Sequence, residues 1–207
     1  MTMLTEKIIY SPAPTPEHLP GLEGASTIKT PGLMEIQHAV AQLYDSGEII
    51  LIDGKPGVGK TFGTKYVLKQ LGVNVHWADM PDTPKGKEAN ARIFTAVTGR
   101  RPPLRMTEYA LTDETVDVLD GLKAVLVVDE AQNMTPHEAK TVITRIGEGS
   151  KLVLIGDLDQ VDTPYLDGKS NGLIHTHERM KGHTITANVR LVHGVRSALS
   201  ELAAQAM

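Results

Sequence analysis

The chain has 207 residues, 41% of them hydrophobic and 22% charged, with a formal net charge of −4, which predicts an ordinary globular protein without a general electrostatic attraction to nucleic acid. Cysteine is absent, which excludes disulfides, thiolate metal sites and a thiol nucleophile. No apolar run approaches the roughly 18 residues that a membrane-spanning helix needs and no signal peptide is recognisable, so we expect a cytoplasmic protein without a membrane partner.

Residues 1–30 are predicted to form an arm or linker. Prolines stand at positions 12, 14, 16 and 20, and proline favours extended backbone over helix or central strand. From Pro31 to Tyr44, apolar residues recur at spacings of three and four, which predicts an amphipathic helix that Ser46 and Gly47 end. We therefore begin the main domain at residue 31 and extend it to residue 207.

After this helix, short apolar runs alternate with helical patterns. The runs cover residues 48–53, 73–78, 124–128 and 151–155, and the helical patterns cover residues 60–71, 85–97 and 136–146. Strands that are apolar on both faces and separated by helices indicate a parallel sheet covered on each side. The sequence therefore predicts a three-layer α/β/α sandwich, with residues 183–187 as a candidate fifth strand and residues 194–204 as a closing helix.

A glycine-rich loop joins the first predicted strand to the next helix. It fits the pattern G-x-x-x-x-G-K-[ST] in full, with the residues Gly54, Lys55, Pro56, Gly57, Val58, Gly59, Lys60 and Thr61. Glycines let backbone N–H groups turn toward phosphate oxygens, and the following helix adds the positive end of its dipole. The loop predicts a site for the phosphates of ATP, in which Lys60 contacts the β- and γ-phosphates and the Thr61 hydroxyl binds Mg²⁺.

Two carboxylates follow the apolar run that ends at Val128. Open α/β sheets bind their ligands at the carboxyl ends of the strands, where Asp129 and Glu130 are expected. We predict that Asp129 holds Mg²⁺ through water, because this ion keeps much of its hydration shell. Glu130 is then the candidate base that orients and deprotonates an attacking water. The alternative is a simple helix-capping turn.

A second polar segment follows the neighbouring run at residues 152–155. Gln160 is the candidate here, because its amide can donate to a phosphate and accept from water at once. A γ-phosphate sensor at this position would report whether the terminal phosphate is present. The alternative is an Asx-rich turn that only ends the strand.

Several segments together resemble the PhoH family of ATPases. They are DEAQNMTP at 129–136, TRIGEGSK at 144–151, GDLDQVD at 156–162, PYLD at 164–167, SNGL at 170–173 and GVRS at 194–197, which continues through ELA at 201–203. The resemblance implies a RecA-like core related to superfamily-one helicases, ATP hydrolysis, and homo-oligomeric rings that are often hexamers. It also implies a role on RNA or DNA. Arg196 becomes the candidate arginine finger toward a neighbouring subunit, and Gln37 is positioned like an adenine-reading glutamine of the helicase relatives.

The interval between Thr61 and Val125 departs from the family, because it is shorter and lacks the family's middle motifs. This part looks more like the compact ATPases that accompany transposases, of the TniB and MuB type. A second hypothesis is therefore an ATP-gated DNA-binding regulator of transposition. A small-molecule kinase is the third, since such kinases share the loop and the magnesium site.

Two other groups of side chains have ordinary interpretations. His175 and His177 could ligate a metal if they lay on a strand, but surface positions explain them without one. Arg100 and Arg101, near Lys85 and Lys87, are candidates for a nucleic-acid path, and solvated surface charge is the alternative.

Overall fold

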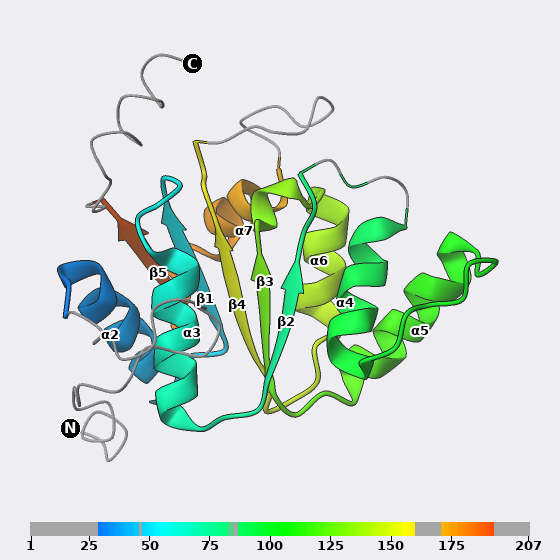
Figure 1. The fold of residues 1–207 in the computed structure, drawn as a ribbon, viewed down its shortest axis with the longest axis horizontal. Coiled ribbons are helices and arrows are strands. Elements are labelled where there is room, and N and C mark those ends of the chain that lie inside the picture. Colours follow the sequence, from blue (N-terminus) through cyan, green and yellow to red (C-terminus); the bar gives the residue numbers. More distant parts are fainter. Residues whose placement is uncertain (1–28, 46, 83, 85–86, 160–170, 193–207) are drawn as a thin grey trace, which may run out of the picture.

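The computed structural model describes residues 29–45, 47–82, 84, 87–159 and 171–192. Within them lies a five-stranded sheet in which all neighbouring strands are parallel, in the order β2-β3-β4-β1-β5 (Figure 1). The strands are β1 Ile49–Gly54, β2 Val75–Asp79, β3 Val125–Asp129, β4 Lys151–Gly156 and β5 Thr186–Leu191. A parallel sheet is therefore confirmed.

Helices cover both faces of this sheet (Figure 1). On one face lie α2 Pro31–Asp45 and α3 Lys60–Leu71. On the other lie α4 Glu88–Thr98, α5 Glu108–Asp120, α6 Pro136–Arg145 and α7 Gly172–Met180, with the short 3₁₀ helix η1 Ala131–Asn133 after β3. The three-layer α/β/α sandwich is confirmed. Among the helices that the structure describes, none is long and apolar enough to cross a membrane.

The central strands are apolar along their whole length because both of their faces are buried. In β1, Ile49 and Leu51 pack toward α4, α6 and α7, whereas Ile50 and Ile52 pack toward α2 and α3. Successive side chains of a strand point to opposite faces, so such a strand needs apolar residues at every position. This is why continuous runs rather than alternating patterns identified the strands.

Strand order determines which loops meet. β4 lies between β1 and β3, so the segments that follow these three strands leave the sheet at one edge. Asp53 of β1 is in register with Gly156 of β4, and Asp79 of β2 with Asp129 of β3. The glycine-rich loop, the acidic pair and the turn after β4 are therefore neighbours.

α6 begins at the predicted residue, and its start is held by a complete capping box. Thr135 accepts a hydrogen bond from the backbone N–H of Glu138, while the Glu138 carboxylate accepts one from the backbone N–H of Thr135. Pro136 occupies the first helical turn, where its missing N–H costs no hydrogen bond. The segment between β3 and α6 is thereby fixed at both ends.

The prediction of the fifth strand at residues 183–187 was wrong in position, because β5 starts at Thr186 and continues to Leu191. β5 is an edge strand in which Asn188 and Arg190 are exposed, so it lacks a continuous apolar run. Helices α5 and α7 were not predicted, since only three residues of each are buried: Leu111, Thr115 and Leu119 in α5, and Gly172, Leu173 and Thr176 in α7. The predicted closing helix and nearly all of the predicted arm lie outside the described residues.

Candidate functional site

The glycine-rich loop leads directly from β1 into α3. Gly59 forms the N-cap of α3 with a left-handed φ of 92°, and no side chain caps this helix end. An added Cβ at Gly59 would meet nothing within 4 Å, so glycine is needed there for its backbone conformation and not for space. The first N–H groups of α3 are thus left for a bound anion, and the helix dipole favours one.

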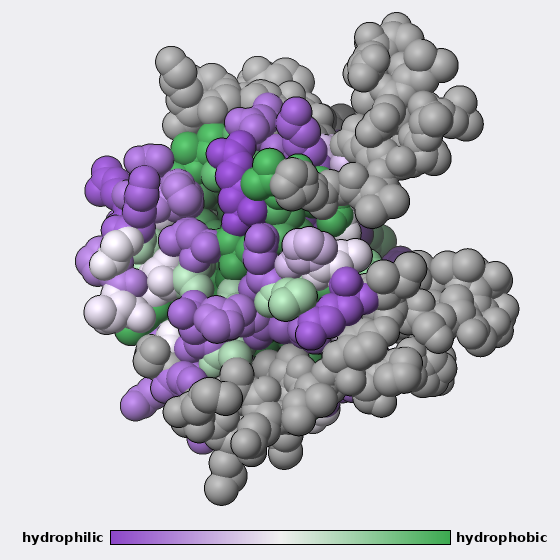
Figure 2. Space-filling model, turned by 90° about the vertical axis from the view of Figure 1, so that its left-hand side faces the viewer, coloured by the Kyte–Doolittle hydropathy of each residue, from purple (hydrophilic) through white to green (hydrophobic). Residues whose placement is uncertain are grey.

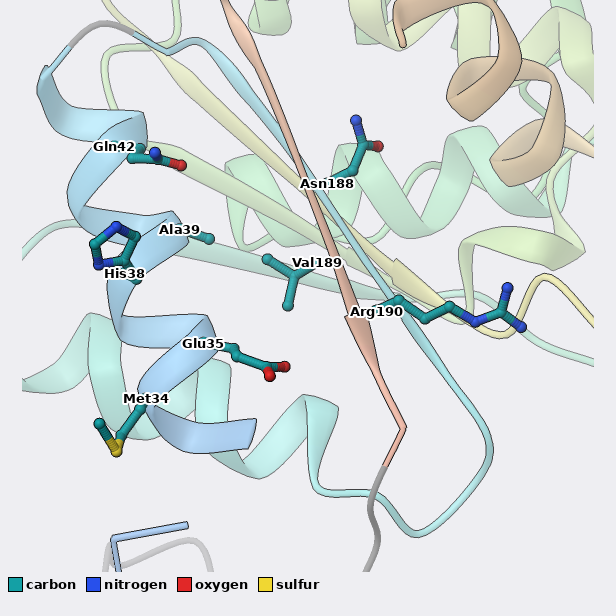
Figure 3. A pocket seen from close by; sticks show the side chains of 8 residues that line it. All are labelled: Met34, Glu35, His38, Ala39, Gln42, Asn188, Val189 and Arg190. Carbon is teal, nitrogen blue, oxygen red and sulfur yellow. The ribbon is translucent and has the colours of Figure 1, made fainter. Parts of the chain in front are cut away.

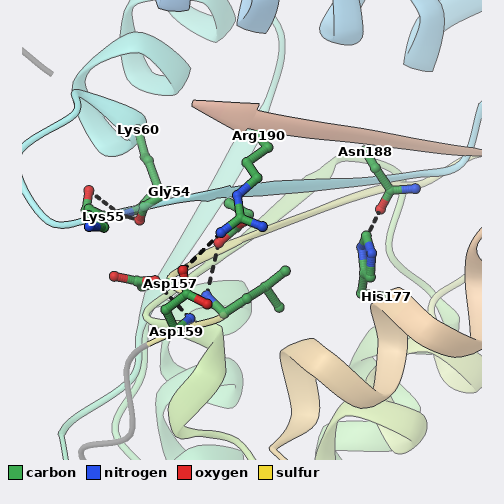
Figure 4. Close-up of polar contacts among 10 residues, drawn as sticks. Gly54, Lys55, Lys60, Asp157, Asp159, His177, Asn188 and Arg190 are labelled. Atoms are coloured by element: carbon green, nitrogen blue, oxygen red, sulfur yellow. Dashed lines mark hydrogen bonds and ion pairs between the residues drawn. The ribbon is translucent and has the colours of Figure 1, made fainter. Parts of the chain in front are cut away.

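The Lys60 side chain is buried beneath this loop, with 8% of its surface exposed. Its ammonium donates to the backbone oxygen of Gly54 at 2.5 Å and to that of Lys55 at 3.2 Å (Figure 4). Burial lowers the pKa of Lys60, and the nearby carboxylates, of which Asp157 contributes most, oppose this shift. An ammonium has three N–H donors, so at least one remains for a ligand.

The hydroxyl of Thr61 and the carboxylate of Asp129 meet across the loop, although 68 residues separate them in the chain. Thr61 Oγ1 donates to Asp129 Oδ2 at 2.8 Å, and the backbone N–H of Glu130 donates to Asp129 Oδ1 at 3.1 Å. Asp129 is buried, and this burial raises its pKa despite both hydrogen bonds. Two oxygen ligands of the kind that Mg²⁺ prefers therefore lie side by side.

This raised pKa predicts a stability effect in metal-free buffer. A carboxyl whose pKa is raised on folding stabilises the protein fully below the unfolded-state pKa, and this contribution is lost as the pH rises through the folded-state pKa. At pH 8 the buried charge of Asp129 opposes folding, so Asp129→Asn should raise Tm with EDTA present. The gain should shrink as the pH falls through the window between the ordinary and the raised pKa, as measured by thermal denaturation.

The control for this prediction is Asp113→Asn, which removes an exposed charge of the same sign from α5. We expect it to leave Tm and its pH dependence close to those of the unsubstituted protein. An Asp129→Asn variant less stable at pH 8 than the unsubstituted protein would contradict the prediction.

Glu130 has a left-handed backbone conformation, with φ 55° and ψ 41°. Among the described residues it is the one non-glycine residue with positive φ, and such a conformation costs about 1–3 kcal/mol. The Glu130 carboxylate accepts a hydrogen bond from Gln132 Nε2 at 2.6 Å. Strain of this kind is concentrated at functional sites, so the geometry of Glu130 marks it as a candidate independently of any motif.

Gln132 also joins η1 to the end of β4. It is buried, and its Oε1 accepts from the backbone N–H of Asp157 at 3.3 Å. A Cβ added to Gly156 would lie 2.3 Å from this same oxygen, so only glycine permits the approach. The segments after β3 and β4 therefore form one connected unit, which the separate motifs in the sequence did not indicate.

A second connection crosses from β1 to β4 and β5. The buried Asp53 accepts from the backbone N–H of Leu158 at 2.9 Å and pairs with Arg190 Nε at 3.3 Å. Arg190 also pairs with Asp159 at 2.8 Å. Figure 4 shows Arg190 beside the turn with Asp157 and Asp159, close to the strand end at Gly54. The sequence analysis missed Asp53 and Arg190, because neither belongs to a recognised motif.

Of the remaining predicted residues, those that the structure describes do not lie in the site described above. Gln160 and Arg196 lie outside the described residues, and Gln37 is half-buried on α2. His175 and His177 lie on the helix α7 and not on a strand, and His177 Nδ1 lies 3.2 Å from Asn188 Oδ1 (Figure 4). In the part of the chain that the structure describes, no cluster of three His, Asp or Glu side chains could hold a metal ion.

The outer side of β5 carries a further cavity of about 470 Å³ against α2. Figure 3 shows Glu35, Ala39 and Gln42 on the side of α2 that is turned toward Val189 of β5. The same side of the molecule presents hydrophilic residues around a smaller hydrophobic area (Figure 2). The cavity mixes acidic, basic and apolar residues, so its lining does not select one kind of ligand.

A parallel sheet in this strand order, with a glycine-rich phosphate loop after β1 and an acidic pair after β3, defines a P-loop nucleoside-triphosphatase fold. Family comparison agrees with this assignment, since the AAA domain matches residues 43–160 and the PhoH-like protein family matches residues 121–207. The chain belongs to the AAA-domain family of P-loop proteins, and its residues 121–207 are similar to the PhoH-like protein family. The resemblance inferred from the sequence motifs is thereby confirmed.

Individual relatives match over shorter stretches. Protein PhoH2 of Bacillus subtilis is 56% identical over 79 residues, which cover 38% of this chain and 18% of the relative. Bacteroides sp. Pif1 in complex with ADP-AlF4 has a TM-score of 0.55 at 19% identity, covering 86% of this chain and 45% of Pif1. Aeropyrum pernix ORC1 in complex with DNA has a TM-score of 0.51 at 20% identity, covering 84% and 48%. At such low identity, these two structures establish the fold alone.

Proposed function

We propose that this protein hydrolyses ATP with Mg²⁺ and couples the reaction to nucleic acid. The observation that carries the proposal is the contact between Thr61 and Asp129 beside the buried ammonium of Lys60. Three groups suited to a metal-bound triphosphate thus converge on one helix amino terminus. Asp129 lies 68 residues after Thr61 in the sequence, so the fold and not adjacency along the chain brings this carboxylate to the loop.

The residues fit Mg²⁺ because a hydroxyl and a carboxylate oxygen, both of a kind that this ion prefers, lie 2.8 Å apart. Thr61 and Asp129 would hold the ion, Asp129 through water. When bound, Mg²⁺ supplies positive charge that offsets the negative charge developing on the phosphates. Lys60 supplies a further positive charge from the protein itself, and the loop N–H groups position the phosphates.

Glu130 is the proposed general base, which orients the attacking water and accepts its proton. Gln132 donates to the Glu130 carboxylate at 2.6 Å, and this contact holds the carboxylate in one orientation. Catalysis by a positioned base typically contributes about 10²–10⁴-fold in rate. In the same proposal Gln160 senses the γ-phosphate, Arg196 acts as an arginine finger from a neighbouring subunit, and Gln37 contacts the adenine.

Thermal protection tests whether nucleotide and metal bind. A ligand that binds only the folded state adds about 2.7 kcal/mol at a hundred times its Kd, so Mg²⁺ and ATP together should raise Tm by several degrees. ATP with EDTA should protect less, because the metal contact of Asp129 is then missing. Absence of any shift at millimolar Mg²⁺ and ATP would contradict the proposal.

Phosphate release measured without an added acceptor tests the reaction itself. Release of inorganic phosphate supports hydrolysis, whereas formation of ADP that requires a small-molecule acceptor and releases no inorganic phosphate favours the kinase hypothesis. ORC1, whose fold is similar, was solved in complex with DNA, and it motivates adding RNA, single-stranded DNA and duplex DNA to the same assay. Rings in solution with RNA-stimulated turnover support the PhoH-like hypothesis. ATP-dependent filaments on duplex DNA support the transposition-regulator hypothesis.

A further inference from the structure

A groove of about 540 Å³ lies between α6 and α7, on the face of the sheet opposite α3. Its charged lining is basic, and its apolar lining includes one side chain from the last turn of each helix. The side chains that matter here are His137, Lys140, His175 and Arg179, with Ile143 and Met180. No aspartate or glutamate lines the groove.

Within the described part of the chain, no carboxylate neutralises the two cations of the groove. Lys140 and Arg179 are exposed, and neither has a carboxylate partner among the described residues. The chain as a whole carries a net charge of −4, so an anionic polymer can be attracted only by a local patch of this kind. The groove therefore favours an anionic partner.

The cleft between β2 and α4, which contains the predicted Arg101, differs from this groove in its charge. Arg101 and Arg92 line that cleft together with Asp79 and Glu88, and Arg92 pairs with Glu88 at 3.5 Å. Positive and negative side chains balance there, so the cleft does not favour a polyanion. Of these two clefts, the α6–α7 groove is the one whose charges have a single sign.

We propose that the α6–α7 groove binds the sugar-phosphate backbone of a single-stranded nucleic acid. Lys140 and Arg179 contact phosphates, the two histidines donate hydrogen bonds, and Ile143 with Met180 contacts sugars or base edges. The 10 residues of α6 span about 15 Å, and the groove of about 540 Å³ has room for a few nucleotides of one strand but not for the width of a duplex. No Phe, Tyr or Trp lines the groove, so the proposed binding rests on backbone contacts and not on a large stacking platform.

Both helices of the groove are attached to the segment that carries Glu130 and Gln132. α6 follows η1 through the Thr135 cap, and the backbone N–H of Gly172 at the start of α7 donates to the oxygen of Met134 at 2.7 Å. A bound nucleic-acid strand that changes the spacing of α6 and α7 would therefore change the position of Glu130, the candidate general base. This coupling between the groove and Glu130 rests on the proposed function. It predicts that nucleic acid stimulates the hydrolysis of ATP.

The test compares Lys140→Ala/Arg179→Ala with the control Lys69→Ala/Lys123→Ala, which removes two exposed cations outside the groove. Binding of labelled oligo(U) and oligo(dT) is followed by fluorescence anisotropy over a salt series. We expect at least about tenfold weaker binding by the groove variant, and a decrease of about 1.4 in the log–log salt slope, since each phosphate contact on a single strand contributes about 0.7. The control should bind like the unsubstituted protein.

The rate of ATP hydrolysis, measured with and without oligonucleotide, tests the groove separately from the proposed function. The groove variant should keep the ATPase rate measured without nucleic acid and lose its stimulation by oligonucleotide. Binding of the groove variant equal to that of the unsubstituted protein, or an equal loss in the control, would overturn the proposal. Displacement of the oligonucleotide by poly-glutamate at matched charge would also overturn it, in favour of an acidic protein partner. If no preparation hydrolyses ATP, the proposed function fails, and the anisotropy series still decides what the groove binds.

Discussion

Replacing Lys60 by alanine is expected to lower the rate of ATP hydrolysis by about 10²–10³-fold, the usual loss when one preorganised charge-stabilising donor is removed. Lys60 lies beneath the loop with its ammonium held by two backbone oxygens, so it is already in place before the phosphates arrive. A positioned charge of this kind needs no reorganisation during the reaction. Steady-state phosphate release is the measurement.

Stability distinguishes loss of chemistry from loss of folding in this variant. Burial lowers the pKa of Lys60, which means that the buried ammonium opposes folding at neutral pH. Lys60→Ala without nucleotide should therefore have a Tm no lower than that of the unsubstituted protein, but it should lose the protection by Mg²⁺ and ATP. The matched control is Lys69→Ala, an exposed lysine in the last turn of the same helix. Turnover near the unsubstituted rate in Lys60→Ala would remove Lys60 from its proposed role.

Replacing Glu130 by glutamine is expected to separate binding from hydrolysis. Glutamine keeps the size and the hydrogen-bonding oxygen but cannot accept a proton at neutral pH, so we expect turnover to fall by about 10²–10⁴-fold. Thermal protection by Mg²⁺ and ATP should persist, because Thr61, Lys60 and Asp129 are unchanged. Retention of labelled ATP after rapid gel filtration measures this state directly.

Two variants sharpen the interpretation of the Glu130 result. Glu138→Gln, a nearby carboxylate that only caps α6, should retain turnover and thus control for the loss of one negative charge. Gln132→Leu removes the hydrogen bond to Glu130 at 2.6 Å while the carboxylate stays. We expect it to lower kcat more than it changes KM for ATP. Hydrolysis by Glu130→Gln at the unsubstituted rate would exclude Glu130 as the base.

The sequence predicted those features that depend on neighbouring residues. The phosphate loop is a contiguous motif. Its glycine at position 59 has a left-handed conformation, which is a local property of the backbone and so can be predicted from neighbouring residues. α3 and α6 start at the predicted residues because their N-termini have local signals, the loop glycines and the Thr135–Glu138 capping box. The buried strands were found because burial on both faces produces continuous apolar runs. The roles of these residues in catalysis stay predictions.

Only the tertiary structure placed the contacts between distant segments. Asp53 and Leu158 are 105 residues apart, and Gln132 reaches Asp157 across 25 residues. Single polar residues of this kind have no periodic pattern, so nothing in the sequence pairs one with another. The α6–α7 groove is a further case, since Lys140 and Arg179 belong to helices joined through another segment.

The amino-acid sequence by itself determined the layered fold, the phosphate loop and the acidic pair, because hydrophobic periodicity, glycine conformation and helix caps act over a few residues. The strand order β2-β3-β4-β1-β5 decided the rest. This order places the carboxyl ends of β1, β3 and β4 next to one another, and α7 packs beside η1. Both arrangements result from packing between distant segments, which no local pattern encodes. Edge strand β5 was misplaced and the partly exposed helix α5 was missed for the same reason, since partial burial weakens the apolar pattern that marks an element.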